Sequence, residues 1–246
     1  MITIQNISKT YKGKENVKAL QNINLTLDKG VYALLGPNGA GKSTLMKILT
    51  LSLKSDSGEV FLDNMSIADC QEKYRSILGY MPQQQTLYNS FKGRTFLNYI
   101  AVLKDLPKQT IPKEIMRVAE SVNLQDKLDE KISGYSGGMK QRLLLASAVM
   151  GTPEFVILDE PTAGLDPRER IRTRRLAKKV SENSTVLFAT HVVSDIEEIA
   201  DKIIILNKGK VIAFDTTVNL INSVPDAQNL EDVYMHYFGR AEDEIC

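Results

Sequence analysis

A glycine-rich loop over residues 36–44 carries the first chemistry that can be read from this chain. It follows the apolar run 31–35 and opens into an apolar segment, 45–49, with the character of a helix. Glycines let successive backbone N–H groups turn inward around a phosphate, and the N-terminus of the following helix adds positive potential. The pattern GxxxxGK(S/T) therefore predicts a phosphate loop and a nucleoside triphosphatase; a plain turn between strand and helix is the alternative. The loop residues are Gly36, Pro37, Asn38, Gly39, Ala40, Gly41, Lys42, Ser43 and Thr44.

Three side chains of this loop have predicted tasks. Lys42 is expected to reach the β- and γ-phosphates of a nucleotide as a point charge. The hydroxyl group of Ser43 is placed to ligate Mg²⁺, and Thr44 is placed to offer a hydroxyl or N–H group to the α-phosphate.

Two adjacent carboxylates, Asp159 and Glu160, follow the apolar run 155–158. They are expected at the C-terminal edge of a buried strand, where α/β sheets hold their ligands. Because neighbouring residues of a strand point in opposite directions, the two acids are predicted to take different roles. Asp159 would hold Mg²⁺ through its water shell, and Glu160 would orient and polarise the attacking water. The alternative is a strand that ends in solvated acids before Pro161.

Two polar residues are predicted at the same sheet edge. His191 directly follows a strand over 186–190, and its imidazole is placed to hydrogen-bond the γ-phosphate and the attacking water. A lone histidine is more often a capping or surface residue. Gln83 ends the segment 79–83 and is able to meet Mg²⁺ or water, although by itself it is a glutamine in a loop.

The pattern of elements predicts a mostly parallel sheet with additional parts. Residues 1–63 contain several strands, with hairpin signals at 12–14 and 28–30. Apolar residues at helical spacing predict a helical insertion over about 84–150. The tail, about 216–246, is partly helical and is expected to pack on the core or on a partner.

Three short apolar runs in the second half, 155–158, 186–189 and 203–206, have the composition of strands buried on both faces. They alternate with predicted covering helices over 167–180 and 192–200. The predicted fold is therefore α/β, with crossover helices around a mostly parallel sheet.

The bulk composition limits the class of protein. At 246 residues the chain is long enough for one large α/β domain over 1–246. A formal net charge of +1 gives no electrostatic footprint for nucleic acid, which is not expected as a partner. The two cysteines, Cys70 and Cys246, lie far apart, so neither a zinc site nor a disulfide framework is suggested and a reducing cytosol fits. No signal peptide and no apolar run long enough to cross a bilayer is found.

Taken together and in order, these motifs resemble those of the ATP-binding-cassette (ABC) ATPases over about residues 11–191. The diagnostic segment is 135–142, YSGGMKQR, which is similar to the family's LSGGQ signature. The resemblance implies a P-loop core with an N-terminal antiparallel β subdomain and a helical signature subdomain. It further implies Gln83 as the Q-loop residue, 163–166 as the D-loop with Asp166, His191 as the switch histidine, and Tyr11 as the aromatic that stacks on adenine.

The segment departs from the family pattern at two positions. Tyr135 stands where leucine is usual and Met139 where glutamine is usual, while Ser136, Gly137 and Gly138, which must approach phosphate, are retained. We expect hydrolysis to survive these changes. The variant with methionine and lysine resembles cassettes of ABC-2-type exporters for drugs and antimicrobial peptides.

The resemblance implies ATP and Mg²⁺ as ligands and a head-to-tail dimer, either a homodimer or a heterodimer of cassettes. In that dimer Ser136, Gly137 and Gly138 of one subunit contact the ATP held by Lys42 and Ser43 of the other. A separate transmembrane permease subunit would dock near Gln83 and the helical insertion, which places the chain peripherally at the cytoplasmic face of the membrane. Two rival functions are a soluble ABC ATPase without a transport role and a P-loop kinase that phosphorylates a metabolite.

Overall fold

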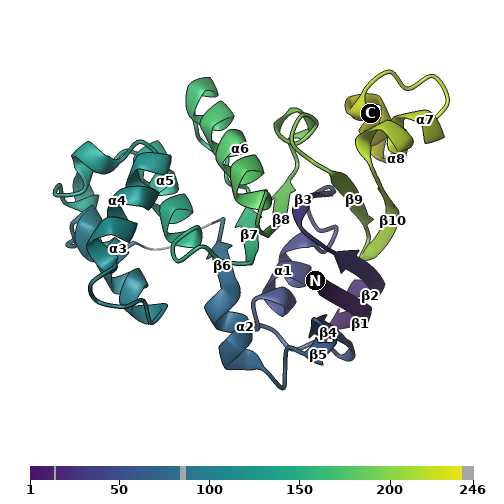
Figure 1. The fold of residues 1–246 in the computed structure, drawn as a ribbon. Helices are drawn as coiled ribbons and strands as arrows, with labels where there is room; N and C mark the ends of the chain where they lie inside the picture. Colours follow the sequence, from purple (N-terminus) through teal and green to yellow (C-terminus); the bar gives the residue numbers. More distant parts are fainter. Residues whose placement is uncertain (14, 84–86, 240–246) are drawn as a thin grey trace.

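Two β-sheets of different kinds organise the computed structural model, which describes residues 1–13, 15–83 and 87–239 (Figure 1). The strands are β1 (Ile2–Tyr11), β2 (Val17–Leu27), β3 (Gly30–Leu35), β4 (Ser57–Leu62), β5 (Met65–Ser66), β6 (Leu78–Met81), β7 (Phe155–Asp159), β8 (Thr185–Thr190), β9 (Lys202–Asn207) and β10 (Lys210–Asp215). An antiparallel sheet has the order β2-β1-β4-β5. A six-stranded sheet has the order β10-β9-β3-β8-β7-β6 and is parallel except for β10.

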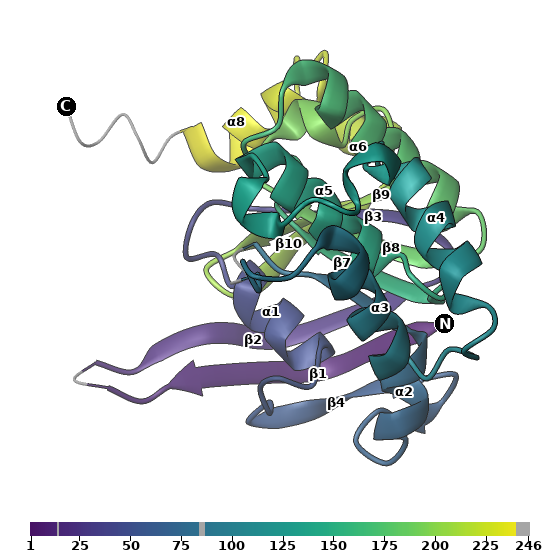
Figure 2. The ribbon, with the colours of Figure 1, turned by 90° about the vertical axis from the view of Figure 1, so that its left-hand side faces the viewer.

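The helices cover these sheets from several sides. They are α1 (Lys42–Leu49), α2 (Gln71–Ile77), α3 (Gly93–Leu103), α4 (Ile111–Ser121), α5 (Gly137–Ala148), α6 (Pro167–Ser181), α7 (Thr217–Ser223) and α8 (Leu230–Phe238), with short 3-10 turns η1 (Gln125–Lys127), η2 (Ile132–Gly134) and η3 (Val193–Asp195). Helix α1 lies between the two sheets (Figure 2), while α3, α4 and α5 form a separate helical lobe beside them (Figure 1). The predicted helical insertion and antiparallel β part are both present. None of the described helices is long and apolar enough to span a bilayer.

The six-stranded sheet explains the continuous apolar runs of the sequence. In β3, Val31, Ala33 and Leu35 face a core shared with the helical lobe, α6 and the C-terminal helices. Tyr32 and Leu34 of the same strand face a second core, made with α1 and the antiparallel sheet. Since successive side chains of a strand point to opposite faces, a strand covered on both sides must be apolar throughout. The prediction of buried parallel strands is confirmed.

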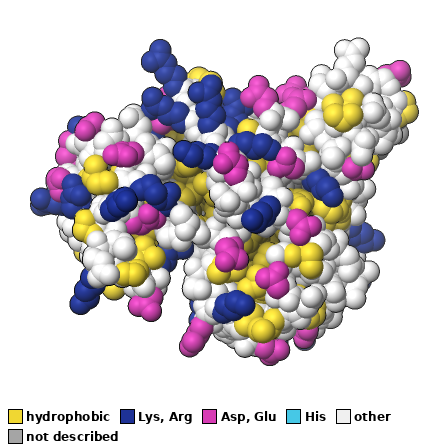
Figure 3. Space-filling view, viewed as in Figure 1, with side chains coloured by type: hydrophobic (Ala, Val, Ile, Leu, Met, Phe, Trp, Pro, Cys, Tyr) yellow, Lys and Arg dark blue, Asp and Glu magenta, His cyan; other side chains and the backbone are white. Residues whose placement is uncertain are grey.

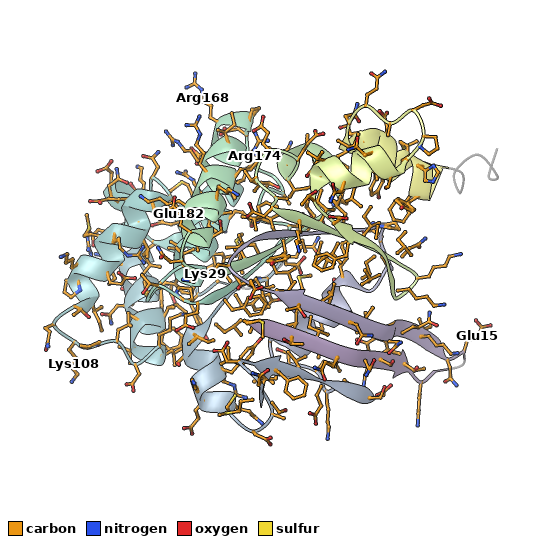
Figure 4. All side chains as sticks on the ribbon, turned by 45° about the vertical axis from the view of Figure 1, so that its right-hand side comes forward. Glu15, Lys29, Lys108, Arg168, Arg174 and Glu182 are labelled. Atoms are coloured by element: carbon orange, nitrogen blue, oxygen red, sulfur yellow. The ribbon has the colours of Figure 1, made fainter. Side chains whose placement is uncertain are left out.

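Helix α6 confirms the predicted covering helix over 167–180 to within one residue. Its outer surface is strongly basic, and dark blue side chains gather over it in Figure 3. Figure 4 labels Arg168 and Arg174 on this helix and Glu182 at its C-terminal end. Its inner residues Thr173 and Ala177 are buried, so the charged side chains remain on the solvent side.

Only one of the two predicted hairpins is a hairpin. The turn signal at 12–14 joins β1 to its antiparallel partner β2, with Glu15 near the tip (Figure 4), although Lys14 lies outside the described residues. The signal at 28–30 is wrong, because this turn leads from β2 in one sheet to β3 in the other. The apolar strand β3 pairs in parallel with β8 and β9, where both of its faces are buried.

The predicted helix over 192–200 is also wrong. The structure has the single 3-10 turn η3 there, followed by irregular turns up to Asp201. Asp195 turns inward, is 2% exposed, and accepts hydrogen bonds from Thr162 and Arg170. Short-range backbone hydrogen bonds hold the successive turns, and the Asp195 side chain ties them to Thr162 and Arg170.

The tail beyond residue 215 packs on the core through α7 and α8. Leu220, Val224, Leu230 and Val233 are buried in the core that contains the helical lobe. A capping box between Asn229 and Asp232 begins α8. Residues 240–246, including Cys246, lie outside the described part of the chain.

Candidate active site

The glycine-rich loop runs from the end of β3 to the start of α1, as the sequence predicts. Gly41 has φ +111°, and a Cβ atom at this position would collide with the carbonyl oxygen of Ala19. A side chain there would require both a strained backbone and displacement of β2. The glycine therefore allows the loop to turn tightly against the antiparallel sheet.

Lys42, the first residue of α1, is 9% exposed. Its ammonium group donates hydrogen bonds to the carbonyl oxygen of Gly36 and, at 3.1 Å, to that of Pro37. Burial lowers the pKa of Lys42, while the negative charges of Glu160 and Asp159 oppose this shift. The loop thus holds a buried cation close to both predicted acids.

A cavity of about 280 Å³ joins the predicted residues. All the predicted loop residues except Gly36 line it, together with Gln83, Asp159, Glu160 and Tyr11; Val17 and Ala19 of β2 complete the wall. The hydroxyl group of Tyr11 lies 3.4 Å from Oγ1 of Thr44, at one side of the loop. Cavities of about 760 and 560 Å³ lie elsewhere, and neither is lined by the loop or by the two acids.

Asp159 and Glu160 are not two successive residues of a strand, as the sequence analysis expected. Asp159 is the last residue of β7, but Glu160 lies beyond the strand with φ +50°, in the left-handed region. Strand alternation therefore does not separate them, and both line the same cavity. A non-glycine residue in this region is uncommon and is held there by its surroundings.

The surroundings of Asp159 change its pKa. Burial and the neighbouring charge of Glu160 raise its pKa to about 6, against the lowering effects of a backbone hydrogen bond from Gln83 and the charge of Lys42. Gln83 itself is exposed. It contacts Asp159 through a hydrogen bond from its backbone.

Glu160 is 6% exposed, and both its carboxylate group and its backbone are hydrogen-bonded. Its Oε1 atom lies 2.8 Å from Nδ1 of His191, and its Oε2 atom accepts a hydrogen bond of 3.1 Å from Thr190. Its N–H group donates to the carbonyl oxygen of Ala189, and its own carbonyl oxygen accepts from Nε2 of Gln141 at 3.1 Å. Sequence analysis identified His191 but missed Thr190 and Gln141. The only feature of the sequence that could have indicated them is that Thr190 precedes His191 and Gln141 follows the signature residues.

The signature residues lie away from this cavity. Ser136 caps α5, its Oγ atom accepting from the N–H group of Met139 at 3.2 Å, and Gly137 and Gly138 form the first turn. None of these three is among the described residues that line the cavity. Tyr135, which replaces the usual leucine, is 4% exposed and donates a hydrogen bond of 2.6 Å to the carbonyl oxygen of Lys127.

Asp166 begins α6 as its N-cap. Its Oδ1 atom accepts hydrogen bonds of 3.0 Å from the N–H groups of Arg168 and Glu169. Nearby, Arg170 donates to both carboxylate oxygens of Asp195 at 3.2 and 2.8 Å, and Thr162 donates to the same group at 2.6 Å. This cluster joins the turn after His191 to the segment after Glu160, and sequence reasoning missed it because its members are far apart in the chain.

Comparison with known proteins agrees with this geometry. A family model described as ABC transporter matches residues 20–163, more than half of the chain. The chain belongs to the ABC transporter family. The match spans the phosphate loop, the signature segment and both acids, and the prediction that this chain is an ATP-binding and ATP-hydrolysing subunit is confirmed.

Curated relatives lie in the same family. The cassette is 36% identical over 212 residues to the uncharacterized ABC transporter ATP-binding protein YxlF of Bacillus subtilis, covering 86% of this chain and 69% of YxlF. It is 34% identical to the linearmycin resistance ATP-binding protein LnrL of the same species, covering 89% and 70%. It is 32% identical to the methionine import ATP-binding protein MetN of Carboxydothermus hydrogenoformans, covering 86% and 65%.

Solved structures share the fold of this ABC cassette. One, described as the ATP binding subunit of an ABC transporter, matches with a TM-score of 0.86 at 25% identity and covers 96% of this chain and 98% of that chain. Another is the dimeric structure of a post-hydrolysis state of the cassette MJ0796 bound to ADP and Pi, with a TM-score of 0.80 at 27% identity, covering 88% and 98%. The predicted α/β P-loop fold is confirmed.

The residues present fit a bound Mg²⁺ ion. Ser43, Asp159 and Gln83, which supply only oxygen donors suited to a hard cation, line one cavity of the ABC cassette. No cluster of three or more His, Cys, Asp or Glu side chains suited to a metal occurs among the described residues. Mg²⁺ typically takes one or two protein carboxylates and completes its shell with water and substrate phosphates, and Asp159 supplies one such carboxylate.

Proposed function

We propose that this ABC ATPase hydrolyses ATP with Glu160 as the residue that orients the attacking water, and that it powers export through a separate permease subunit. The observation that carries the catalytic assignment is the Glu160 carboxylate, which is buried between His191 and Thr190 at the cavity of the phosphate loop. A buried carboxylate with both oxygens oriented is suited to hold a water molecule in one position. Residues 1–246 would act as one ATPase domain, with about 84–150 as its helical part and about 216–246 as its tail.

The chemistry follows from the arrangement of the cavity. Loop N–H groups and Lys42 bind the phosphates, Thr44 lies toward the α-phosphate, and Tyr11 stacks on adenine. A water oxygen bonds to the γ-phosphorus, its proton moves toward Glu160, and the bond from that phosphorus to the β,γ-bridging oxygen breaks to leave ADP. His191 orients Glu160 and donates toward the γ-phosphate. Mg²⁺ at Ser43, Asp159 and Gln83 would neutralise phosphate charge when bound.

Two subunits are needed to complete the site. Ser136, Gly137 and Gly138 form an anion-binding helix start in the helical lobe. Lys42 lines the cavity at the start of α1, a different helix that lies apart from this lobe in Figure 1. A head-to-tail dimer lets the signature of one protomer close over the nucleotide of the other, with Asp166 near the same junction. The dimeric form of the related cassette MJ0796 supports a dimer for this chain. Binding of ATP would favour the closed dimer, and loss of phosphate would release it.

Glu160→Gln tests the catalytic assignment. The substitution keeps the shape of the side chain but removes its ability to take a proton, so we expect ATP hydrolysis to fall at least about a hundredfold. Nucleotide binding should persist, and the dimer should accumulate in ATP and Mg²⁺ when measured by size-exclusion chromatography with light scattering. Near-normal turnover would remove Glu160 from this role.

Mixing two inactive variants tests the shared site. Lys42→Ala destroys the phosphate cradle, and Ser136→Arg destroys the signature, so neither homodimer has a competent site. A mixed dimer has one intact site, formed by the cradle of the Ser136→Arg protomer and the signature of the Lys42→Ala protomer. An equal mixture should regain about a quarter of the normal activity if exchange is random. No recovery after mixing would argue against the head-to-tail arrangement.

Export is the direction that the sequence favours. Met139 and Lys140, together with the segment 164–167, resemble ABC-2-type exporters. The relative LnrL is named for linearmycin resistance, whereas the relative MetN is named for import. The permease would dock near Gln83 and the helical lobe, where Tyr88 and Tyr99 are 51% and 41% exposed. Exposed aromatic side chains that contact one another are suited to a protein interface. This docking would hold the chain at the cytoplasmic face of the membrane.

Isolation with a membrane partner tests the transport role. A tagged chain should co-purify with a polytopic membrane protein, and vesicles that contain the pair should move cargo away from the ATP-binding side. Movement toward that side would reverse the assigned direction. Persistent isolation without any membrane protein would favour the soluble ABC ATPase instead.

A further inference from the structure

Helix α5 contacts the segment that follows the catalytic strand of its own chain. A Cβ atom on Gly138 would lie 3.5 Å from Cδ2 of Leu165, so the Leu165 side chain packs against the first turn of the helix. One turn later Nε2 of Gln141 donates to the carbonyl oxygen of Glu160 at 3.1 Å, and Nε of Arg142 lies 3.5 Å from Oε2 of Glu169. The helix that begins with the signature is therefore attached to residues 160–169.

Glu160 receives most of its other described contacts from a different direction. Ala189, Thr190 and His191, at the end of β8, bind its N–H group and its two carboxylate oxygens. The Glu160 carbonyl oxygen accepts two hydrogen bonds of 3.1 Å, one from the N–H group of Ala163 in the following turn and one from Gln141, which is the contact from the helical lobe. The Glu160 backbone is thus held between a strand and a helix.

The backbone conformation makes this second contact important. Glu160 has φ +50°, a conformation that a residue with a side chain adopts only when its surroundings hold it. Without the bond from Gln141, residues 160–163 would have one contact fewer to the helical lobe, and a shift of this segment would move the Glu160 carboxylate in the cavity. A misplacement of about 1 Å of a reacting group can reduce a rate about a hundredfold.

We propose that Gln141 is a positioning residue that holds Glu160 of its own chain in its left-handed conformation, although it belongs to the helix whose N-terminus serves the neighbouring subunit. This inference rests on the proposed catalytic role of Glu160. It assigns to α5 a second task, directed at the site of its own subunit.

Gln141→Met tests the assignment because methionine keeps the length of the side chain and removes the donor. We expect kcat to fall roughly tenfold, while the affinity for ATP stays within about twofold, since the carboxylate acts on the water and not on the nucleotide. Gln71→Met is the matched control: Gln71 on α2 also donates through Nε2 to a backbone carbonyl, that of Ala68, at 3.1 Å, but it is exposed and far from the site. It should leave kcat unchanged.

The mixed dimer separates action on the own chain from action on the neighbour. Gln141→Met is added either to the Ser136→Arg protomer, which contributes Glu160 to the intact site, or to the Lys42→Ala protomer, which contributes the signature. Activity of the mixture should fall roughly tenfold in the first case only, because only there does Gln141 hold the working Glu160. If the fall occurs in the second case instead, Gln141 serves the signature and the proposal is overturned.

Two further results keep the tests distinct. If Glu160→Gln abolishes hydrolysis and Gln141→Met does not change it, the positioning role fails while the proposed function stands. If Glu160→Gln is active, the proposed catalytic role of Glu160 fails, and the positioning role of Gln141 that rests on it fails with it. Should Gln141→Met fold poorly, Gln141→Asn, whose amide group is too short to reach the Glu160 carbonyl, must show the same fall in kcat; full activity of this variant contradicts the proposal.

Discussion

Nδ1 of His191 and Oε1 of Glu160 lie 2.8 Å apart and form a hydrogen-bonded pair just beyond the C-terminal ends of the neighbouring strands β8 and β7. The two side chains differ greatly in exposure, since that of His191 is 59% exposed and that of Glu160 is 8% exposed. The carboxylate is thus fixed inside the protein while the imidazole ring reaches the solvent side of the site. A neutral ring that donates from Nδ1 keeps Nε2 as an acceptor, and a protonated ring can donate from both atoms.

His191→Ala should lower ATP hydrolysis about a hundredfold while leaving nucleotide binding nearly intact, because it removes a group that orients the Glu160 carboxylate. The measurement is steady-state phosphate release together with equilibrium binding of a fluorescent ATP analogue. His236→Ala is the control, since the second histidine of the chain lies on the C-terminal helix α8. Equal losses in the two variants would show that removal of a histidine acts through general instability.

The sequence was sufficient for the parts of the site that depend on local pattern. The loop at 36–44, the acids after the apolar run at 155–158 and the parallel strands follow from spacing and hydrophobicity. The contacts of Glu160 with Thr190 and Gln141 were not predictable, because they depend on which elements pack together. The same holds for Asp195, which lies in a 3-10 turn where a helix over 192–200 was expected and is buried against Thr162 and Arg170 from other parts of the chain.

Asp159→Asn should stabilise the protein in the absence of nucleotide and Mg²⁺ above about pH 6, while it abolishes hydrolysis. The pKa of Asp159 is raised from 3.8 to about 6 in the folded state by burial and by Glu160. Between these values the folded state binds more protons than the unfolded state, so this group's contribution to stability is lost as pH rises from about 4 to about 6. The asparagine variant should lose this part of the pH dependence.

Denaturant unfolding at several pH values, with EDTA present, measures this effect. The wild type and Asp159→Asn should have similar free energies of unfolding near pH 4, and the variant should be more stable at pH 7.5. A difference that does not change with pH would mean that the substitution acts through packing rather than through charge. Such a gain in stability on loss of function is expected for a site that places two carboxylates together.

Tyr135→Phe should lower the free energy of unfolding by about 1 kcal/mol, because it removes the shorter of two hydrogen bonds to the carbonyl oxygen of Lys127 and leaves the one from the N–H group of Glu130. Tyr135→Leu, which restores the residue usual in the family, should cost more, since the smaller side chain leaves space in a site that is 4% exposed. Hydrolysis should persist in both variants, as Ser136 and the following glycines are unchanged. Urea unfolding and steady-state assays of the same preparations make the comparison; greater stability of Tyr135→Leu would show that the helical lobe repacks.

Two cations of α6 allow a matched test of burial. Arg170 binds both oxygens of Asp195, whose side chain is 3% exposed, whereas Lys178 binds Asp201 at 2.7 Å in a pair whose side chains are both 47% exposed. Arg170→Met leaves a buried carboxylate with Thr162 as its remaining described donor, so the free energy of unfolding should fall by about 3 kcal/mol. Lys178→Met breaks an exposed pair and should lower it by less than about 1 kcal/mol.

The same two variants also test the active site. Asp195 lies in the turn after His191 and binds Thr162, which lies two residues after Glu160, so it links the two loops that carry these side chains. Arg170→Met should therefore also reduce kcat at a temperature where the variant remains folded, and Lys178→Met should not. Raising the salt concentration should weaken the Lys178 pair and leave the difference caused by Arg170 largely unchanged, since buried charges are screened much less than exposed ones. Equal losses of stability in the two variants would indicate that water reaches Asp195, and the buried cluster would then have no special role in holding the two loops together.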